Sequence, residues 1–458
     1  MQIPATIFRE YDIRGTVGDQ LTAEVARAVG QAFATLAWER LKRAPRLAVG
    51  RDNRPSGPAL VQGVLSGVEA VGGHGVDIGE APTPALYFAT HVLNVDGGVQ
   101  VTGSHNPPAF NGFKLVLSGE AVAGPDIQEL RRLIEDGRTP GRTGGSRSRD
   151  DSVLARYRDA VAQRNGPLPR RVKVVVDCGN GVSSLVAVET LRQLGAEVVP
   201  LFCDSDGTFP NHHPDPTVLE NLRDLQAAVA RERAELGIAF DGDGDRIGAV
   251  DDQGRVLFGD QLLVLLGRDL AHRMGPGHPV IFDVKCSEVL PQELARVGLK
   301  PTMWKTGHSL IKQKMKELDA PLAGEMSGHM FFGGDWYGFD DALFAAARLL
   351  GYVAERGGPL SRLLADLPQT VSTPELRVDW PDERKFDVVA RAARHFAAKY
   401  PVSTLDGVRI TFADGWGLLR ASNTQPVLVL RFEAGSEAAL AAYRTEVEGW
   451  LATQGLRP

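Results

Sequence analysis

Three stretches of this 458-residue chain repeat one pattern, and this repetition constrains the fold more than any other feature. Each stretch opens with a short apolar strand that ends in polar residues, followed by a helix that closes with glycine and by another strand. The opening strands are Leu47-Ala-Val-Gly-Arg-Asp52, Val174-Val-Val-Asp-Cys-Gly179 and Val280-Ile-Phe-Asp-Val-Lys285. The repeat predicts three tandem α/β domains of one ancestry.

A later strand in each repeat runs into a distinctive polar loop. These strands are Gly98-Val-Gln-Val-Thr102, Gly237-Ile-Ala-Phe-Asp241 and Ala323-Gly-Glu-Met326, and their loops read TGSHNPP, DGDGDR and GEMSGH. Ligands of open α/β sheets collect at the carboxyl ends of the strands. We therefore expect the three loops to face one cleft between the domains.

The pattern changes after Leu367. A helix from about Asp382 to Tyr400, three closely spaced strands and a final helix predict an α+β domain. The stretch from Gly137 to Ser146, rich in Gly and Arg, marks the first domain connection. The predicted fold is three homologous α/β domains with mixed sheets plus a C-terminal α+β domain around a central cleft, with boundaries 1–150, 151–252, 253–366 and 367–458.

Composition excludes several classes of protein. With 43% hydrophobic residues and a formal net charge of -6, the chain predicts a globular protein without general affinity for nucleic acid or anionic membranes. Cys178, Cys203 and Cys286 form no CxxC pair, which argues against disulfides and structural zinc. The start lacks a signal-peptide pattern and no long apolar run occurs, so we expect a soluble cytoplasmic protein.

The loop DGDGDR offers three carboxylates, Asp241, Asp243 and Asp245, at alternating positions after an apolar strand. Carboxylate oxygens suit hard cations such as Mg²⁺ or Ca²⁺, and the glycines let the loop curl until the three converge. A calcium loop of the EF-hand type needs Gly where Arg246 stands. Arg246 suits an anionic ligand that shares the metal, such as phosphate. The alternative is a polar turn without a metal.

The loop TGSHNPP carries a hydroxyl nucleophile, Ser104, next to His105 and near Lys114. Serine needs a base, a metal or a covalent modification to react. A phosphoserine oxygen would be a natural further ligand for Mg²⁺ beside the carboxylates. Ser-Asn-Pro sequences also build ordinary turns, which is the alternative for this loop taken alone.

The loop GEMSGH offers Glu325, Ser327 and His329, a set that suits the vicinal hydroxyls of a sugar, with His329 also able to move protons. A lone His after Gly is more often structural. Lys285 and His308 end neighbouring strands and would line the same cleft.

Near the C-terminus, Arg420-Ala-Ser-Asn-Thr-Gln425 and Arg431 combine guanidinium groups with hydroxyls, as a phosphate dianion requires. This combination predicts a phosphate anchor. The pair His212-His213 near Asp215 could suggest zinc, but its proline-rich setting and lack of a third soft ligand favour a structural loop.

Together, FREYDIRG, TGSHNPPAFNGFK, DGDGDR, GEMSGH and RASNTQPVLVLRFEA resemble the motif set of the α-D-phosphohexomutase superfamily, closest to its bacterial phosphomannomutase/phosphoglucomutase branch. The resemblance extends from Tyr11 to Glu433 with the motifs in the family order. It implies a four-domain, heart-shaped enzyme whose fourth domain closes over the cleft by a hinge near Leu367.

The family mechanism implies that a phosphorylated Ser104 gives its phosphoryl group to a hexose 1- or 6-phosphate. The 1,6-bisphosphate then reorients end over end in the cleft and transfers its other phosphate to Ser104. Asp241, Asp243 and Asp245 would hold Mg²⁺ with the phosphoserine. Arg246 and Lys114 would lie beside the reacting group, with Lys114 or His329 as general acid or base. The resemblance thus implies hexose phosphates as substrates, glucose 1,6-bisphosphate as activator and intermediate, and a protein that we expect to be monomeric.

The resemblance also implies a set of substrate-binding residues. They lie in the N-terminal loop, in a pair that selects between the two binding orientations of the substrate, in the sugar-binding loop GEMSGH and in the site for the distal phosphate. In that order they are Tyr11 and Arg14, then Lys285 and His308, then Glu325, Ser327 and His329, and then Arg420, Ser422, Asn423, Thr424 and Arg431. Gln425 departs from the family, which has a small hydroxyl residue there. Met326 favours use of both glucose and mannose phosphates over glucosamine phosphate. Phosphoglucosamine mutase, a simple phosphatase and a non-catalytic binding protein are the competing interpretations.

Overall fold

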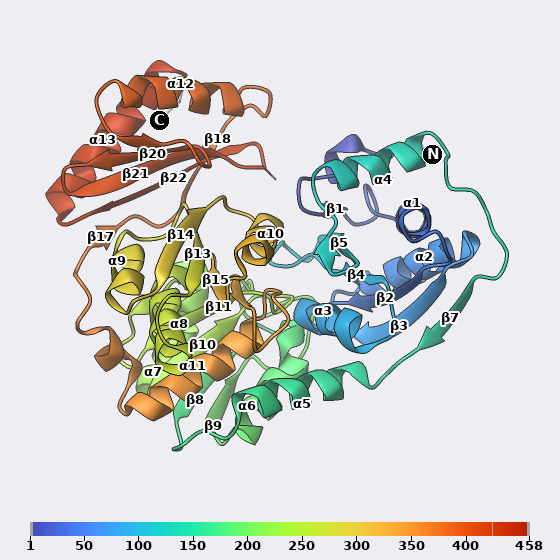
Figure 1. The fold of residues 1–458 in the computed structure, drawn as a ribbon, viewed down its shortest axis with the longest axis horizontal. Helices are drawn as coiled ribbons and strands as arrows, with labels where there is room; N and C mark the ends of the chain where they lie inside the picture. The colour runs from blue at the N-terminus through green and yellow to red at the C-terminus, as the bar shows by residue number, and fades with distance from the viewer. Residues whose placement is uncertain (1–2, 424, 456–458) are drawn as a thin grey trace.

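A computed structural model of the chain describes residues 3–423 and 425–455. Four sheets follow one another along the chain, each with its own helices (Figure 1). The predicted α/β class with three related units and a different C-terminal unit is confirmed. Short 3-10 helices also occur, at Ala5–Ile7, Val182–Leu185, Leu219–Leu222 and Leu360–Leu364.

The first unit is built on a sheet of order β1-β5-β4-β2-β3-β7, with β6 paired to β5. Its strands are β1 (Ile13–Thr16), β2 (Arg46–Arg51), β3 (His74–Glu80), β4 (Gly97–Val101), β5 (Phe110–Leu117), β6 (Glu120–Ala121) and β7 (Ser146–Arg149). Its helices are α1 (Ala23–Leu41), α2 (Gly57–Ala70), α3 (Thr83–Val92) and α4 (Pro125–Glu135). The N-terminal segment contains β1, which pairs antiparallel with β5.

The second unit has the sheet order β12-β11-β10-β8-β9. Its elements are α5 (Val153–Asn165), β8 (Lys173–Asp177), α6 (Ala187–Gln193), β9 (Glu197–Leu201), α7 (Arg223–Glu232), β10 (Leu236–Phe240), β11 (Ile247–Asp251) and β12 (Val256–Leu257). Because β12 pairs with β11, the second sheet continues past residue 252, where we place the domain boundary. The boundaries themselves stay predictions.

The third unit has the order β14-β13-β15-β16. Its elements are α8 (Gly259–Met274), β13 (Pro279–Asp283), α9 (Val289–Arg296), β14 (Lys300–Trp304), α10 (His308–Leu318), β15 (Leu322–Gly324), β16 (Met330–Phe332) and α11 (Ala342–Arg356). Asp341 caps α11, its Oδ1 accepting from the backbone N–H of Phe344 at 2.9 Å.

One strand arrangement recurs in these three units. A central strand (β2, β8 or β13) pairs in parallel with two neighbours, and the second neighbour (β4, β10 or β15) pairs antiparallel with the strand that follows it. The connection between those last two strands is the TGSHNPP, DGDGDR or GEMSGH loop in turn. Equivalent places in three repeats therefore carry the three polar loops.

The fourth unit is an antiparallel sheet of order β17-β22-β21-β20-β19, with β18 also on β22. Its elements are β17 (Val371–Ser372), β18 (Leu376–Asp379), α12 (Lys385–Ala397), β19 (Val402–Ser403), β20 (Val408–Phe412), β21 (Gly415–Ala421), β22 (Val427–Ala434) and α13 (Glu437–Thr453). Figure 1 shows this unit adjoining the third unit, with the first unit across from it. In the described part of the chain, no helix has the length and apolar character needed to cross a membrane.

Candidate active site

A cavity of about 580 Å³ lies where the four units meet. Every described residue of the predicted substrate-binding set lines it, namely Tyr11, Arg14, Lys285, His308, Glu325, Ser327, His329, Arg420, Ser422, Asn423 and Arg431. Thr424 lies outside the described residues. Basic side chains outnumber acidic ones in the wall, and they are Arg9, Arg14, Arg246, Lys285, Arg377, Arg420 and Arg431. Such a wall favours anionic ligands.

Ser104 lies on a loop whose backbone is hydrogen-bonded to the side chain of Arg54. The guanidinium of Arg54 is fully buried and donates to the carbonyls of Ser104 (2.8 Å), Asn106 (2.6 Å), Pro107 (2.7 Å) and Phe110 (3.0 Å). Ser104 has a φ of 50°, a left-handed conformation that costs energy for a residue with a Cβ. The buried Arg54 therefore fixes a strained loop.

The hydroxyl of Ser104 faces the second unit. Its Oγ lies 3.4 Å from Oδ2 of Asp241 and 3.1 Å from Nδ1 of His105. Ser104 is only 1% exposed, and its loop neighbours His105 and Asn106 form the adjoining wall of the cavity. Burial and the nearby positive charges of Arg246 and Arg14 hold the pKa of His105 well below its usual range.

The three carboxylates of DGDGDR converge as the sequence predicts. Asp241, Asp243 and Asp245 are fully buried, and one carboxylate oxygen from each lies within 4.8 Å of the other two. Oδ1 of Asp241 accepts the backbone N–H groups of Gly244 (3.0 Å), Asp245 (3.1 Å) and Arg246 (3.1 Å), which curls the loop. Helix α3 of the first unit anchors Asp243, whose Oδ2 accepts from Thr83 Oγ1 at 2.6 Å.

These carboxylates fit a hard divalent cation. Oδ1 of Asp243 and Oδ1 of Asp245 are buried and have no hydrogen-bond partner among the residues that the structure describes. Burial raises the pKa of Asp241 well above its usual range, and the charges of Asp243 and Asp245 raise it further. A cation would supply the missing partners and offset this repulsion, and an all-oxygen donor set suits Mg²⁺.

Lys114, on β5, sits against the same carboxylates. Its Nζ donates to Oδ2 of Asp243 at 2.7 Å and also contacts Oδ2 of Asp245. Burial alone would lower the pKa of Lys114, but the two carboxylates outweigh it and raise that pKa well above its usual range. The ammonium thus joins the first unit to the metal-type loop.

Arg246 and His329 join the second and third units. Their backbones form an isolated antiparallel bridge, and Arg246 Nε donates to His329 Nε2 at 2.9 Å. Both side chains line the cavity. The ring of His308 lies 5.8 Å from that of His329 and 5.9 Å from that of Tyr11.

The GEMSGH loop presents oxygen acceptors to the cavity. Glu325 Oε1 accepts from the backbone N–H of Gly307 at 2.5 Å, and Ser327 Oγ lies 3.4 Å from Glu325 Oε2. Burial raises the pKa of Glu325. Met326 is 4% exposed, and its backbone N–H donates to Asp283 Oδ1 at 3.1 Å.

The fourth unit closes the other side of the cavity. Asn423 Nδ2 donates to the hydroxyl of Tyr11 at 2.7 Å, which joins the last unit to the first. Arg420 pairs with Asp406 at 3.2 Å. Arg431 pairs with Asp260 at 3.2 Å, so this predicted phosphate ligand is partly engaged by a carboxylate of α8.

Sequence reasoning missed several residues of the site. Glu375 Oε2 lies 3.1 Å from Lys285 Nζ, and Arg377 donates to Gln425 Oε1 at 3.1 Å. With Arg54, these residues have no motif of their own, although Arg54 follows the first repeat's opening strand directly. Outside the cavity, His212 lies 3.1 Å from Asp177 Oδ2 and contacts the carbonyl of His213.

These features define a four-domain α/β protein whose basic cavity is assembled from all four domains beside an acidic, metal-type loop. Comparison with known proteins then gives the family. Family models for phosphoglucomutase/phosphomannomutase match throughout, with α/β/α domains I, II and III at residues 5–140, 155–254 and 258–371 and the C-terminal domain at 375–449.

Individual relatives agree. The phosphomannomutase/phosphoglucomutase of Pseudomonas aeruginosa is 48% identical over 449 residues, 97% of this chain and 95% of that protein. A phosphoglucomutase of Neisseria gonorrhoeae is 45% identical over 442 residues, 96% of this chain and 95% of that protein. A crystal structure of a family protein from Burkholderia thailandensis, 45% identical, superposes with a TM-score of 0.92 and covers 100% of this chain and 99% of its own. The chain belongs to the phosphoglucomutase/phosphomannomutase family and is an enzyme of the mutase, or isomerase, class.

Proposed function

We propose that this enzyme moves a phosphoryl group reversibly between the 1- and 6-positions of glucose and mannose phosphates, through a phosphorylated Ser104 and a 1,6-bisphosphate intermediate. The observation that carries the proposal is the position of Ser104 Oγ, 3.4 Å from Asp241 Oδ2, on a loop whose next residues, His105 and Asn106, line a basic cavity of about 580 Å³. A hydroxyl beside buried carboxylates and cations fits a phosphoryl carrier.

The chain's own residues account for each step. The bond between the phosphorus and Ser104 Oγ breaks as a sugar hydroxyl attacks, and the hydroxyl's proton passes to a general base. His329 is the better candidate for the base because it lines the cavity, whereas Lys114 lies behind it between Asp243 and Asp245. Arg246, beside His329, provides positive charge near the transferred group.

After the first transfer, the sugar carries two phosphates and must present the other one to Ser104. Arg420, Arg431 and Lys285 provide cationic groups on the far wall for the phosphate that is not reacting. Glu325 and Ser327 provide acceptors and a donor for ring hydroxyls. Ser104 Oγ then attacks the phosphorus of the other phosphate and gives up its proton. The bond between that phosphorus and the sugar oxygen breaks, and the sugar oxygen takes up the proton that the general base received in the first transfer. This restores the phosphoserine and releases the isomerised sugar phosphate.

Asp241, Asp243 and Asp245 are the proposed holders of Mg²⁺ together with the phosphoserine. When bound, the ion would neutralise charge on the group in transfer. Glucose 1,6-bisphosphate is the proposed activator because it can rephosphorylate Ser104 whenever the intermediate escapes. The metal assignment depends on the buried oxygens Asp243 Oδ1 and Asp245 Oδ1, which have no hydrogen-bond partner among the described residues.

The finer substrate assignment rests on Met326 and the relatives' names. The Pseudomonas aeruginosa protein is named for both mannose and glucose phosphates, and the Neisseria gonorrhoeae protein for glucose phosphate alone. Met326 lies on the sugar loop and lines the cavity. We assign both sugars to this enzyme, and we expect it to act as a cytoplasmic monomer.

A coupled assay tests the assignment. Glucose 1-phosphate, mannose 1-phosphate and glucosamine 1-phosphate are supplied separately, with and without Mg²⁺ and glucose 1,6-bisphosphate. Comparable turnover of the first two, dependent on Mg²⁺, is expected. Turnover of glucosamine 1-phosphate with mannose 1-phosphate ignored would identify a phosphoglucosamine mutase instead.

Two further outcomes of the same assay would indicate a different activity. Release of inorganic phosphate equal to substrate loss, without an isomerised sugar, would indicate a phosphatase. Binding of sugar phosphates without turnover, in enzyme treated with the bisphosphate, would indicate a binding protein. Transfer of ³²P from labelled glucose 1,6-bisphosphate to Ser104, mapped by peptide mass spectrometry, tests the covalent intermediate directly.

A further inference from the structure

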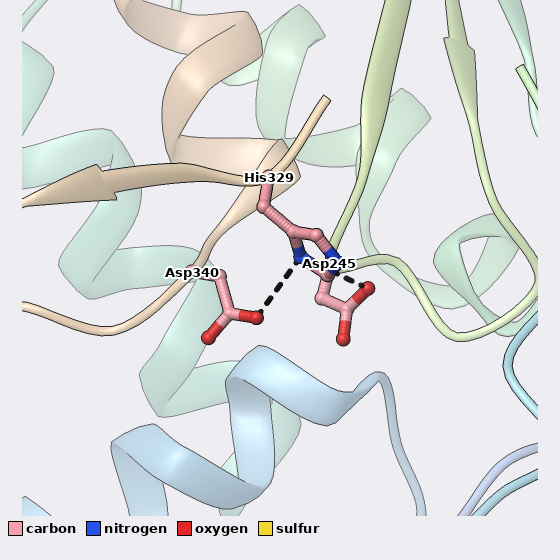
Figure 2. A group of neighbouring side chains, drawn as sticks. All are labelled: Asp245, His329 and Asp340. Carbon is pink, nitrogen blue, oxygen red and sulfur yellow. Dashed lines mark ion pairs between the residues drawn. The ribbon is translucent and has the colours of Figure 1, made fainter. Parts of the chain in front are cut away.

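His329 has a second, buried face that the proposed reaction does not use. One ring nitrogen, Nε2, accepts from Arg246 Nε at 2.9 Å. The other, Nδ1, points to two carboxylates: it lies 3.1 Å from Asp340 Oδ2 and 3.6 Å from Asp245 Oδ1 (Figure 2). All three residues are 3% exposed or less.

The Arg246 contact indicates which nitrogen carries the proton in the wild-type enzyme. A guanidinium only donates, so Nε2 must use its lone pair as the acceptor. The proton of the neutral ring is therefore on Nδ1, between the two carboxylates. A protonated Nδ1 has no lone pair for a metal, so His329, Asp245 and Asp340 are not arranged as a second cation site, although their atoms lie close enough to form one.

Asp340 is the better placed of the two carboxylates to hold this proton. Asp340 Oδ2 and His329 Nδ1 are both buried without a hydrogen-bond partner in the described part of the chain, and they lie 3.1 Å apart, whereas Nδ1 lies 3.6 Å from Asp245 Oδ1. Asp245 also belongs to the loop that we propose holds Mg²⁺. Asp340 lies outside that loop.

Asp340 is in turn fixed from its far side. Its Oδ1 accepts from Lys312 Nζ at 3.0 Å, and that ammonium lies 4.4 Å from the centre of the Tyr87 ring on α3. The backbone of Asp340 also bridges Phe331 on β16. Burial alone would raise the pKa of Asp340, but Lys312 and His329 lower it well below its usual range. The carboxylate is therefore charged, and Lys312 and the backbone bridge hold it in place.

We propose that Asp340 is a positioning residue that holds the Nδ1 proton of His329, fixes the ring's orientation and keeps Nε2 the accepting nitrogen at the cavity. This inference rests on the proposed function, in which His329 moves a proton of the sugar hydroxyl. The sugar hydroxyl requires an accepting Nε2, and this nitrogen becomes available to it when Arg246 Nε gives up its hydrogen bond. A carboxylate behind the opposite nitrogen is a general way to secure such an acceptor. Lys312 holds Asp340 in the same way, so the arrangement reaches from the cavity to the first domain.

The test compares two neighbouring buried aspartates. Asp340→Asn keeps the shape, but its amide N–H₂ can turn to Nδ1 and favour the opposite tautomer. We expect kcat to fall about 10²–10⁴-fold with KM within roughly twofold. Asp341→Asn is the matched control, because Asp341 bonds to Tyr157 and Trp336 and caps α11, away from the cavity. We expect its kcat to stay within about threefold of wild type.

A double variant separates positioning from structure. If Asp340 acts through His329, Asp340→Asn adds no further loss of kcat to His329→Ala. A further loss equal to that of Asp340→Asn alone, or a wild-type kcat in Asp340→Asn, would overturn the inference. Should Asp340→Asn fail to fold because Lys312 is left unpaired, Lys312→Met/Asp340→Asn removes both charges and takes its place in the comparison.

A spectroscopic measurement keeps this test separate from the proposed function. In ¹⁵N-histidine-labelled enzyme, with the His329 signals assigned from His329→Ala, we expect the Nδ1–H tautomer in wild type and in Asp341→Asn, and its loss in Asp340→Asn. If the wild-type enzyme shows this tautomer but isomerises no sugar phosphate, the proposed function is wrong, whereas the inferred contact between Asp340 and His329 still holds. The same tautomer in Asp340→Asn and wild type would contradict the role of Asp340.

Discussion

The first three domains and the fourth are held in different ways. One hydrophobic core contains residues of all three, among them Leu86, Val174 and Leu343, and the first domain also has a second core that includes Phe33 and Phe113. The fourth domain has a core of its own, and the small apolar cluster that it shares with the third consists of buried Val284, Trp416 and Leu418. Much of the remaining contact is made by charged groups.

Arg409 illustrates the second kind of attachment. Its guanidinium donates to the carbonyls of Val284 (2.6 Å) and Cys286 (2.9 Å), pairs with Glu288 at 3.0 Å and lies 3.8 Å from the Trp416 ring centre. Polar interfaces between domains of one chain favour relative motion, whereas a shared apolar core opposes it. The proposed reacting groups therefore lie in the part with the shared core, which we call the fused part, and the proposed phosphate ligands Arg420 and Arg431 lie in the domain whose attachment favours motion.

Changes in the fused part should therefore lower kcat, and changes at the fourth domain should chiefly raise KM. The largest effect is expected for Ser104→Ala, which removes the phosphoryl carrier: a loss of at least about 10³-fold in kcat. Ser118→Ala is a matched control, because Ser118 also has a positive φ (53°) but is exposed in a turn. Full mutase activity in Ser104→Ala would refute the covalent mechanism.

The metal-type loop should come next. Asp243→Asn keeps an acceptor for Thr83 but removes one charge from the cation site, so kcat should fall about 10²-fold or more. Calorimetry should show weaker Mg²⁺ binding in the variant, and chelation of metal should inactivate the wild type reversibly. If Asp243→Asn binds Mg²⁺ and transfers phosphate from Ser104 as the wild type does, the loop has another purpose.

The same contrast explains what the sequence could predict. The three polar loops were predictable because Gly-spaced Asp, Ser and Glu directly follow apolar strands, a local signal that the repeat triples. Asp340 gave no such signal, since its partners Lys312 and His329 meet it only through folding. Arg54 was equally hidden, because the carbonyls that it binds lie 50 to 56 residues away along the chain.

At the fourth domain, Arg409→Met should raise KM for sugar phosphates about tenfold and change kcat less than about threefold, because the domain loses its charged anchor while the reacting groups stay in place. Steady-state kinetics give both values, and small-angle scattering should report a more open average shape. Arg444→Met, on the outer helix α13 where Arg444 pairs with Glu448, is the control. If kcat fell by the same factor by which KM rose, Arg409 would influence the reacting groups as well as the attachment of the fourth domain.

The smallest effect concerns the ion pair between Glu375 and Lys285. Burial alone would raise the pKa of Glu375, but Lys285 and Arg377 lower it from 4.5 to about 2. A folded-state pKa below the unfolded value means that the carboxylate stabilises the fold above about pH 4.5 and loses this contribution as pH falls toward 2. Glu375→Gln should therefore melt roughly 2–4 °C below wild type at pH 7, and the gap should narrow below pH 4.5.

Glu220→Gln, at a solvent-exposed ion pair, should show no such gap at any pH. Calorimetric scans between pH 7 and pH 3.5 provide the comparison, provided that each transition is reversible. If Glu375→Gln lowered the melting temperature by the same amount at every pH, the Glu375–Lys285 contact would stabilise the protein by packing and not by charge. Packing contacts as well as charged groups would then hold the fourth domain to the third. The fourth domain would therefore be less free to move than the Arg409 contacts alone indicate.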